Sequence, residues 1–286
     1  MALVPTRILV DSAVAAGGGI GSFNVLHLET AEAIVGGAEV AGLPVILQIS
    51  QNCAAYHGAL EPITVGAAAI ARAANVPVAL HLDHAEDEQL VYQAFDLGFG
   101  SVMYDGAHLP FEENVATTAR VVERAHALDI FVEAELGKVG GKDGAHAPGV
   151  RTDPDEAAAF MKATGVDALA VAVGSSHAMT ERGAALDLEL IAQLKRSVHV
   201  PLVLHGSSGV PDDVLVQAVL AGMTKINVST HLNGFFTRAV RETLTALPDL
   251  VDSRKYVAAG REALAAEAAR MLTLLALRPD PANPVS

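Results

Sequence analysis

Three histidines in this sequence stand at or just after the ends of short apolar runs, where they could bind one metal ion. His84 follows the run that ends at Asp83, His205 closes the run that begins at Pro201, and His177 lies in a small-residue segment after a third run. A lone histidine at such a place is more often a hydrogen-bonded core residue. Three on separate runs favour a metal site, and three imidazoles with an open fourth position are typical of catalytic zinc.

Polar residues close all eight of the apolar runs that we interpret as strands. A polar group is costly at the end of a buried strand unless it is paired or binds something. These residues are Asn24, Ser50, Asp83 with His84, Asp105, Glu135, His177, His205 and Asn227. Within the motif HLDH (81–84), His81 and Asp83 share a strand face. We therefore expect His81 to be structural and His84 to turn over the open end of the strand.

Two clusters of small and hydroxyl-bearing residues stand directly before helices and could hold a phosphate. The first is Gly206-Ser207-Ser208-Gly209, and the second is Asn227-Val228-Ser229-Thr230. Backbone N–H groups at a helix N-terminus bind anions, and the loops after the seventh and eighth strands are the usual phosphate site of a (β/α)8 barrel. Each cluster alone could simply cap a helix. The adjacent pair favours a phosphate site.

Two other charged residues are better explained by the fold than by catalysis. Glu133 shares a strand face with Glu135, and Lys225 shares one with Asn227, so we expect a buried Lys225–Glu133 ion pair inside the barrel. A Schiff-base mechanism needs a desolvated nucleophilic lysine. The apolar run 168–173, which we interpret as the sixth strand, contains no lysine. This mechanism is therefore disfavoured.

Short β-branched runs alternate along the chain with longer alanine-rich amphipathic stretches. The predicted strands are Gly21–Asn24, Val45–Ser50, Val78–Asp83, Ser101–Asp105, Phe131–Glu135, Ala168–Val173, Pro201–His205 and Lys225–Val228. The predicted helices are Glu29–Ala41, Pro62–Ala74, Asp87–Leu97, Pro110–Leu128, Asp155–Thr164, Asp187–Lys195, Pro211–Ala221 and Thr230–Leu247. Eight such units predict an α/β fold that closes into a (β/α)8 TIM barrel, with its active site where the strands end.

The alternative architecture is an open doubly wound sheet, which should carry a glycine-rich turn after its first strand. The glycine run 17–21 precedes that strand instead, so this alternative is disfavoured. An extra C-terminal helix is predicted over 254–275. The tail 278–286 holds three prolines and is predicted to be disordered. No linker interrupts the units, so residues 1–286 are predicted to form a single domain.

Composition narrows the classes of function. The chain has 286 residues, is 51% hydrophobic and carries a formal net charge of −14. That charge argues against a nucleic-acid partner, because no basic stripe is present to neutralise phosphates. The apolar runs are too short to span a membrane, and no signal peptide is evident. A single cysteine, Cys53, excludes an internal disulfide and predicts a reducing, cytoplasmic location.

At these same residues the sequence resembles the class II ketose-bisphosphate aldolases, the zinc-dependent fructose- and tagatose-bisphosphate aldolases. The resemblance runs from Phe23 to about Tyr256, and motif order and spacing agree throughout. The matching motifs are FNVLHLETAEAIV, PVILQIS, HLDH, SVMYDG, LPFEEN, VEAELGKVGG, TDP, HGSSGVP, KINVST and DSRKY. Chain length and the motif LPFEEN are closer to the tagatose-type branch.

The resemblance implies a role for each site residue. Asp83 is implied as the acid/base, and His84, His177 and His205 as the ligands of one catalytic Zn²⁺. The positions of Asp105 and Glu135 match a second or alternative divalent site, and a monovalent cation is a further expected cofactor. The predicted substrate and phosphate-binding residues are Asn24, Ser50, Ala178, Gly206, Ser207, Ser208, Asn227, Val228, Ser229 and Thr230. The family also implies a homodimer or homotetramer.

Several positions depart from the family pattern. The loop 140–144 reads GGKDG and lacks the glutamate that takes the C3 proton of the substrate, so Asp143 is the candidate base in its place. Ala178 and Ser207 stand where the family has glycine, and His231 replaces an acidic residue. The basic residue for the distal phosphate falls at alanine in 258–259, with basic residues nearby at 254 and 261.

The predicted function is reversible retro-aldol cleavage of a ketose (bis)phosphate to dihydroxyacetone phosphate and an aldehyde. Zinc would stabilise the enediolate as a Lewis acid, and Asp83 would move the proton of the C4 hydroxyl. Two alternatives stay open at the level of sequence. One is a barrel that binds zinc and a sugar phosphate without turnover. The other is an aldolase for a ketose 1-phosphate that lacks the second phosphate.

Overall fold

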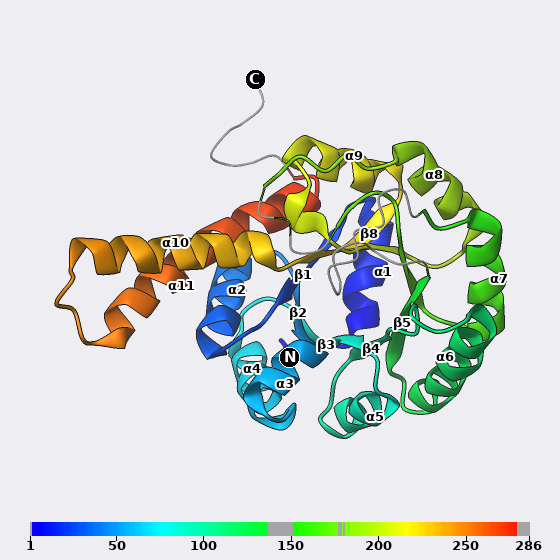
Figure 1. Ribbon diagram of the computed structural model, residues 1–286, viewed down its shortest axis with the longest axis horizontal. Coiled ribbons are helices and arrows are strands. Elements are labelled where there is room, and N and C mark those ends of the chain that lie inside the picture. Colours follow the sequence, from blue (N-terminus) through cyan, green and yellow to red (C-terminus); the bar gives the residue numbers. More distant parts are fainter. Residues whose placement is uncertain (1, 137–150, 177–178, 180, 279–286) are drawn as a thin grey trace.

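In the computed structural model, which describes residues 2–136, 151–176, 179 and 181–278, eight parallel strands close into a barrel in sequence order (Figure 1). The strands are β1 (Ile20–Asn24), β2 (Val45–Ser50), β3 (Val78–Ala85), β4 (Ser101–Tyr104), β5 (Phe131–Leu136), β6 (Ala168–Val171), β7 (Leu202–Leu204) and β8 (Met223–Val228). Strand β2 matches its predicted run, and the ends of the other seven strands lie within two residues of the predicted ends. The predicted (β/α)8 barrel is confirmed.

Helices follow the strands and form the outer ring. They are α2 (Leu28–Ala41), α4 (Glu61–Ala73), α5 (Glu88–Asp96), α6 (Phe111–His126), α7 (Pro154–Thr164), α8 (Leu188–Ser197), α9 (Asp212–Ala221) and α10 (Thr230–Ala246). Local sequence explains many of their ends. Asp153 accepts hydrogen bonds from two N–H groups in the first turn of α7, Pro154 begins the helix, and Gly165 ends it in the left-handed conformation.

Two helices were not predicted. Helix α1 (Thr6–Ala16) packs across the end of the barrel where the strands begin, and its Leu9 and Val10 join an inner core cluster with Ile20 and Phe131. Its N-cap residue, Pro5, makes no side-chain capping bond, so the usual start signal is missing. Helix α3 (Gln51–His57) is a seven-residue helix directly after β2 and is too short to show a clear period.

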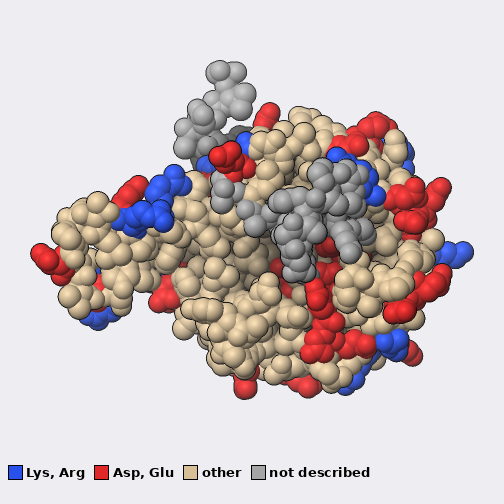
Figure 2. Space-filling model, viewed as in Figure 1, with Lys and Arg blue, Asp and Glu red and all other residues tan. Residues whose placement is uncertain are grey.

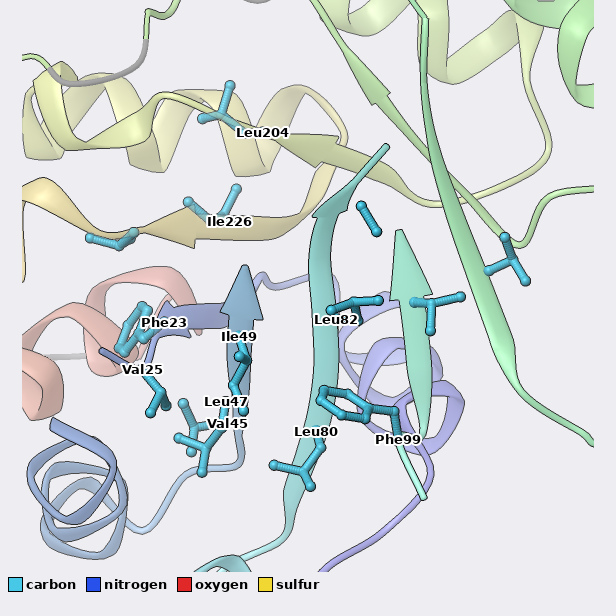
Figure 3. Packing of buried hydrophobic residues seen from close by; sticks show 14 of the residues in the cluster. Phe23, Val25, Val45, Leu47, Ile49, Leu80, Leu82, Phe99, Leu204 and Ile226 are labelled. Atoms are coloured by element: carbon cyan, nitrogen blue, oxygen red, sulfur yellow. The ribbon is translucent and has the colours of Figure 1, made fainter. Parts of the chain in front are cut away.

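The strands send alternate side chains to the two sides of the barrel wall, as strand geometry requires. Val45, Leu47 and Ile49 of β2 point outward to the helices, as do Leu80 and Leu82 of β3 (Figure 3). The residues between them therefore point into the barrel. Register pairs Gln48 with His81 and Ser50 with Asp83. The alternation is what places polar side chains inside a barrel whose outer wall is entirely apolar on these strands.

Helices α10 and α11 (Ser253–Leu275) form a hairpin that projects from the side of the barrel (Figure 1). We call residues 233–259 the arm, because none of them is buried. The inner part of α11 packs tightly on α2, where a Cβ at Gly37 would lie only 2.5 Å from the Ala265 carbonyl oxygen. The predicted helix over 254–275 is thus confirmed. Apart from Arg278, the predicted tail lies outside the described residues.

None of the helices among the described residues is both long and apolar enough to cross a membrane. On the face seen in Figure 2, the Lys and Arg side chains of the described residues lie in separate groups and form no continuous stripe. The expectation that nucleic acid is not a partner comes from the net charge of −14 and stays a prediction.

Candidate active site

His84 reaches the open end of the barrel through a local break in strand geometry. The pairing of β3 with β4 shifts register between Leu82 and Ala85, and His84 adopts a φ of +48°. A non-glycine residue in this region costs about 1–3 kcal/mol and persists mainly where surrounding contacts hold it. Nδ1 of His84 lies 2.9 Å from Oδ2 of Asp105. The predicted turn of His84 away from the strand face is therefore present.

His205 directly follows β7 and is fully buried between two carboxylates. Its Nδ1 lies 2.9 Å from Glu135 Oε2, and its Nε2 lies 3.0 Å from Glu133 Oε1. Burial alone would lower the pKa of His205, but the two carboxylates raise it to about 10. The two carboxylates thus favour the protonated ring, and a metal at one nitrogen would replace that proton while the carboxylate at the other nitrogen orients the imidazole.

The candidate ligands converge. The rings of His84 and His205 are 4.6 Å apart between centroids. Ligand atoms of Asp83, His84 and His205 all lie within 4.8 Å of one another, and so do those of His84, Asp105 and Glu135. Imidazole nitrogens with carboxylate oxygens are a donor set that suits zinc and related divalent ions. His177, the third predicted ligand, lies outside the described residues.

Asp83 is buried inside the barrel mouth among side-chain amides. Asn227 Nδ2 lies 3.3 Å from its Oδ1, and the amides of Gln48 and Asn24 lie 3.4 and 3.5 Å from its Oδ2. Burial raises the pKa of Asp83, but the nearby His84, His205, Lys225 and His81 outweigh burial and lower that pKa overall. The carboxylate is therefore ionised at neutral pH, which is the form that accepts a proton.

Gln48 is a site residue that sequence reasoning missed. It was passed over as part of an apolar run, yet it is 1% exposed and donates to both Asn24 Oδ1, at 2.6 Å, and Asp83. The alternation of side chains along a strand could have identified Gln48 from the sequence. Gln48 is two residues before Ser50 on the same strand, so it shares the inward face whose end was already predicted to be functional.

The two predicted phosphate clusters meet in space. Ser207–Gly209 forms a 3₁₀ turn, and the hydroxyl of Ser207 donates to the carbonyl of Asn227. The backbone N–H of Ser229 donates to Ser208 Oγ at 3.4 Å. Neither α9 nor α10 has a side-chain cap at its start. Simple helix capping therefore does not explain these residues.

Gly206 holds a position that only glycine fits. Its φ is +66°, and a Cβ there would stand 2.6–2.9 Å from the backbone atoms of Ser176. The adjacent Ser175 donates from Oγ to the His205 carbonyl at 2.6 Å. The loop after β6 is thus packed directly on the segment that follows His205.

The other predicted site residues have structural surroundings that differ from those of Asp83, His84 and His205. Ser50 Oγ accepts a hydrogen bond from Cys53 N and caps α3, which is the structural alternative for this residue. Val228 is buried at the end of β8 and Thr230 begins α10. Asp143 and Ala178 lie outside the described residues. The predicted ion pair is present, with Lys225 Nζ 2.9 Å from Glu133 Oε2.

The two arginines near the predicted distal-phosphate position differ in their surroundings. Arg261 Nη1 lies 2.7 Å from Glu32 of α2. Arg254 pairs with Asp252, two residues away, and its side chain is 89% exposed. His231, which replaces an acidic residue of the family pattern, lies 2.6 Å from Glu267 of α11. The substituted histidine therefore gains a carboxylate partner from a different helix.

Comparison with known proteins agrees with this geometry. Residues 4–278 match the family described as fructose-bisphosphate aldolase class-II. The chain is 41% identical over 268 residues to a "Probable fructose-bisphosphate aldolase" of Bacillus subtilis (strain 168), covering 92% of this chain and 94% of that protein. It is 40% identical over 270 residues to the fructose-bisphosphate aldolase of Geobacillus stearothermophilus, covering 93% and 94%. Among solved structures, the YdjI aldolase from Escherichia coli K12 superposes with a TM-score of 0.84 at 32% identity, covering 96% of this chain and 97% of that one.

Proposed function

Because this chain belongs to the class II fructose-bisphosphate aldolase family and is an aldolase, we propose that it cleaves a ketose bisphosphate reversibly to dihydroxyacetone phosphate and an aldehyde phosphate. The observation that carries the proposal is the convergence of Asp83, His84 and His205 at the ends of their strands. Fructose 1,6-bisphosphate is the first substrate to test, because the two relatives near 40% identity are named for fructose bisphosphate.

Class II aldolases are in general metal-dependent, and the donor set of this chain fits a divalent ion. We propose that His84, His205 and His177 hold one Zn²⁺. Asp105 and Glu135 would either orient these histidines or serve a second divalent site. When bound, the metal would act as a Lewis acid toward negative charge that develops at the ketone end of the substrate.

We assign the transfer of the C4 hydroxyl proton to Asp83. Its lowered pKa keeps the carboxylate ready to accept that proton when the bond between C3 and C4 breaks. In the direction of synthesis the same group would return the proton. Asp143 is proposed, on sequence alone, as the base that removes the C3 proton of dihydroxyacetone phosphate.

The phosphate next to the ketone is assigned to the junction of the two serine-containing clusters. The contacts between 207–208 and 227–229 support this assignment, because they hold the 3₁₀ turn 207–209 against the start of α10. Helix N-termini favour anions through their unpaired N–H groups. Binding energy at this phosphate would serve to orient the reacting carbons.

We further propose that the chain acts as a single domain and as a homo-oligomer, with the arm as the contact surface. The tip of the arm exposes Leu247, at 54%, and Val251, at 90%. Helix α11 begins at the outer end of the arm (Figure 1), so Arg254 is held away from the barrel of its own chain. A part for Arg254 at the distal phosphate would therefore need the arm of a second copy. The cytoplasmic location stays a prediction.

The test is a panel of ketose mono- and bisphosphates assayed for dihydroxyacetone phosphate, with added Zn²⁺ and with a chelator. We expect chelator-sensitive cleavage of at least one bisphosphate. Asp83→Asn is the matched variant, since it preserves size while removing the base. A metal-binding protein that cleaves none of the panel would favour a barrel that binds sugar phosphates without turnover.

A further inference from the structure

The buried ammonium of Lys225 makes three contacts inside the barrel. Its side chain is 1% exposed, and Nζ lies 2.9 Å from Glu133 Oε2, 2.8 Å from Asn227 Oδ1 and 3.5 Å from His81 Nε2. An ammonium has three N–H groups, so each can be directed at one acceptor. The Glu133 contact accounts for the burial of the charge. The Asn227 contact is different, because it reaches a residue of the candidate active site.

Lys225 fixes which way the Asn227 amide faces. A lysine ammonium only donates hydrogen bonds, so the group of Asn227 that faces it must be the amide oxygen. The NH₂ group is then turned toward Asp83, and Nδ2 lies 3.3 Å from Asp83 Oδ1. With the amide reversed, Nδ2 would face the ammonium and an oxygen would face the Asp83 carboxylate. Both contacts would then be repulsive.

We propose that Lys225 is a positioning residue that locks the Asn227 amide so that its N–H donor holds the carboxylate of Asp83 in place. This proposal rests on the proposed function, since it gives Lys225 a part in aligning the acid/base of the aldol reaction. The ammonium does not touch the substrate. It acts through one rotatable amide whose alternative orientation would push Asp83 away.

The other oxygen of Asp83 is held in a similar way but without a permanent charge. The hydroxyl of Ser22 donates to Gln48 Oε1, and Gln48 Nε2 donates to Asn24 Oδ1 at 2.6 Å. The NH₂ groups of Gln48 and Asn24 are thereby turned toward Asp83 Oδ2. A serine hydroxyl can donate or accept, so it permits either orientation of Gln48. Lys225 is therefore the more decisive of the two anchors.

Glu133 links this anchor to the metal site. Its Oε1 lies 3.0 Å from His205 Nε2, while its Oε2 faces Lys225. Removal of Lys225 alone would leave a buried carboxylate without its cation and could unfold the protein. The informative variant therefore changes both partners. Glu133→Gln keeps an oxygen for His205, and Lys225→Met fills the space of the lysine stem without charge.

The experiment is a double-mutant cycle for cleavage of fructose 1,6-bisphosphate by the zinc-loaded protein. Lys225→Met is added to Glu133→Gln, first with Asn227 present and then in the Asn227→Ala variant. With Asn227 present we expect kcat/KM to fall by about tenfold to a hundredfold, because misplacement near 1 Å costs about that much. In the Asn227→Ala background the same step should change kcat/KM little. An equal loss in both backgrounds, or no loss in either, would overturn the proposal.

Ser101→Ala is the matched control. Ser101 Oγ lies 2.8 Å from His81 Nδ1 and 2.7 Å from Thr6 Oγ1, so it belongs to the same buried polar chain but lies farther from Asp83. It should lower the free energy of unfolding and leave kcat/KM near that of the unchanged protein. A loss of kcat/KM as large as that from Lys225→Met would show general damage to the interior and would overturn the proposal.

A structural measurement separates failure of this proposal from failure of the proposed function. If the unchanged protein cleaves no ketose phosphate, the proposed function fails. The orientation of the Asn227 amide then decides the role of Lys225. It would be read from C–O and C–N bond lengths in atomic-resolution crystal structures with and without Lys225→Met/Glu133→Gln. A reversed or disordered amide in the variant supports the proposal, and an unchanged amide overturns it.

Discussion

Replacement of Gly206 by alanine should damage both stability and the metal site, for reasons that can be separated. Gly206 has a φ of +66°, and an added Cβ would stand 2.6 Å from the Ser176 carbonyl carbon and 2.7 Å from its oxygen. The left-handed conformation costs an alanine about 1–2 kcal/mol. The close contact is with backbone, which cannot rotate away, and overpacking of this kind adds about 1–3 kcal/mol. We therefore expect a loss of about 2–5 kcal/mol in the free energy of unfolding.

Gly58→Ala supplies the matched control. Gly58 also has a positive φ, +79°, but nothing lies within 4 Å of where its Cβ would stand. This variant should lose only the strain component, about 1–2 kcal/mol. Urea unfolding measures both losses, and their difference isolates the contact with Ser176.

The same contact predicts a functional difference. Ser176 directly precedes His177, a predicted zinc ligand, so pressure on its backbone should weaken metal binding. Gly206→Ala should lower kcat/KM by about a hundredfold, as a shift near 1 Å can do, whereas Gly58→Ala should keep full activity. Equal unfolding free energies for the two variants, together with full activity of Gly206→Ala, would refute this reasoning.

Variants of Asp83, Ser208 and Arg254 test the acid/base and the two phosphate positions. Asp83→Ala should retain the metal and the fold but lose about 10²–10⁴-fold in kcat, measured at saturating substrate; unchanged turnover would assign the proton transfer to another group. Ser208→Ala should raise KM for every phosphorylated ketose by about tenfold or more, since hydrogen bonds to charged groups contribute about 1.5–3 kcal/mol. A change in kcat alone would argue against phosphate binding at Ser208. Arg254→Ala should raise KM for a 1,6-bisphosphate but not for the matching 1-phosphate. Arg261→Ala is the comparison, because the Arg261 side chain already pairs with Glu32. An equal change in KM for both substrates would show that Arg254 does not bind the distal phosphate.

The barrel could be predicted because its sequence signals are local. Outward-facing residues such as Leu80 and Leu82 alternate with inward-facing His81 and Asp83, and this period of two is visible without any long-range information. The same period of two predicted the ion pair between Lys225 and Glu133, which lie on strands far apart in the chain. Helix boundaries followed from capping residues and left-handed glycines for the same reason.

Features that depend on distant contacts could not be predicted in this way. The positive φ of His84 arises from a register shift between β3 and β4, which no pattern within the motif HLDH reveals. The sequence shows His231 in place of an acidic residue of the family pattern, but it does not show that Glu267 on α11 brings a carboxylate to this histidine. Helix α1 was not predicted because its N-terminus has no side-chain cap and its buried residues pack on the end of the barrel where the strands begin.

Metal content and cleavage, measured together on the same protein samples, test whether His84 and His205 hold a catalytic zinc. The unchanged protein and a His84→Ala/His205→Ala variant would be purified with Zn²⁺, analysed for bound metal and assayed for dihydroxyacetone phosphate from fructose 1,6-bisphosphate. We expect about one tightly bound zinc per unchanged chain, as three imidazole ligands imply. We also expect activity that a chelator removes and zinc restores, and neither metal nor activity in the variant. Full zinc occupancy in the variant, or cleavage that persists in the chelated protein, would contradict this expectation.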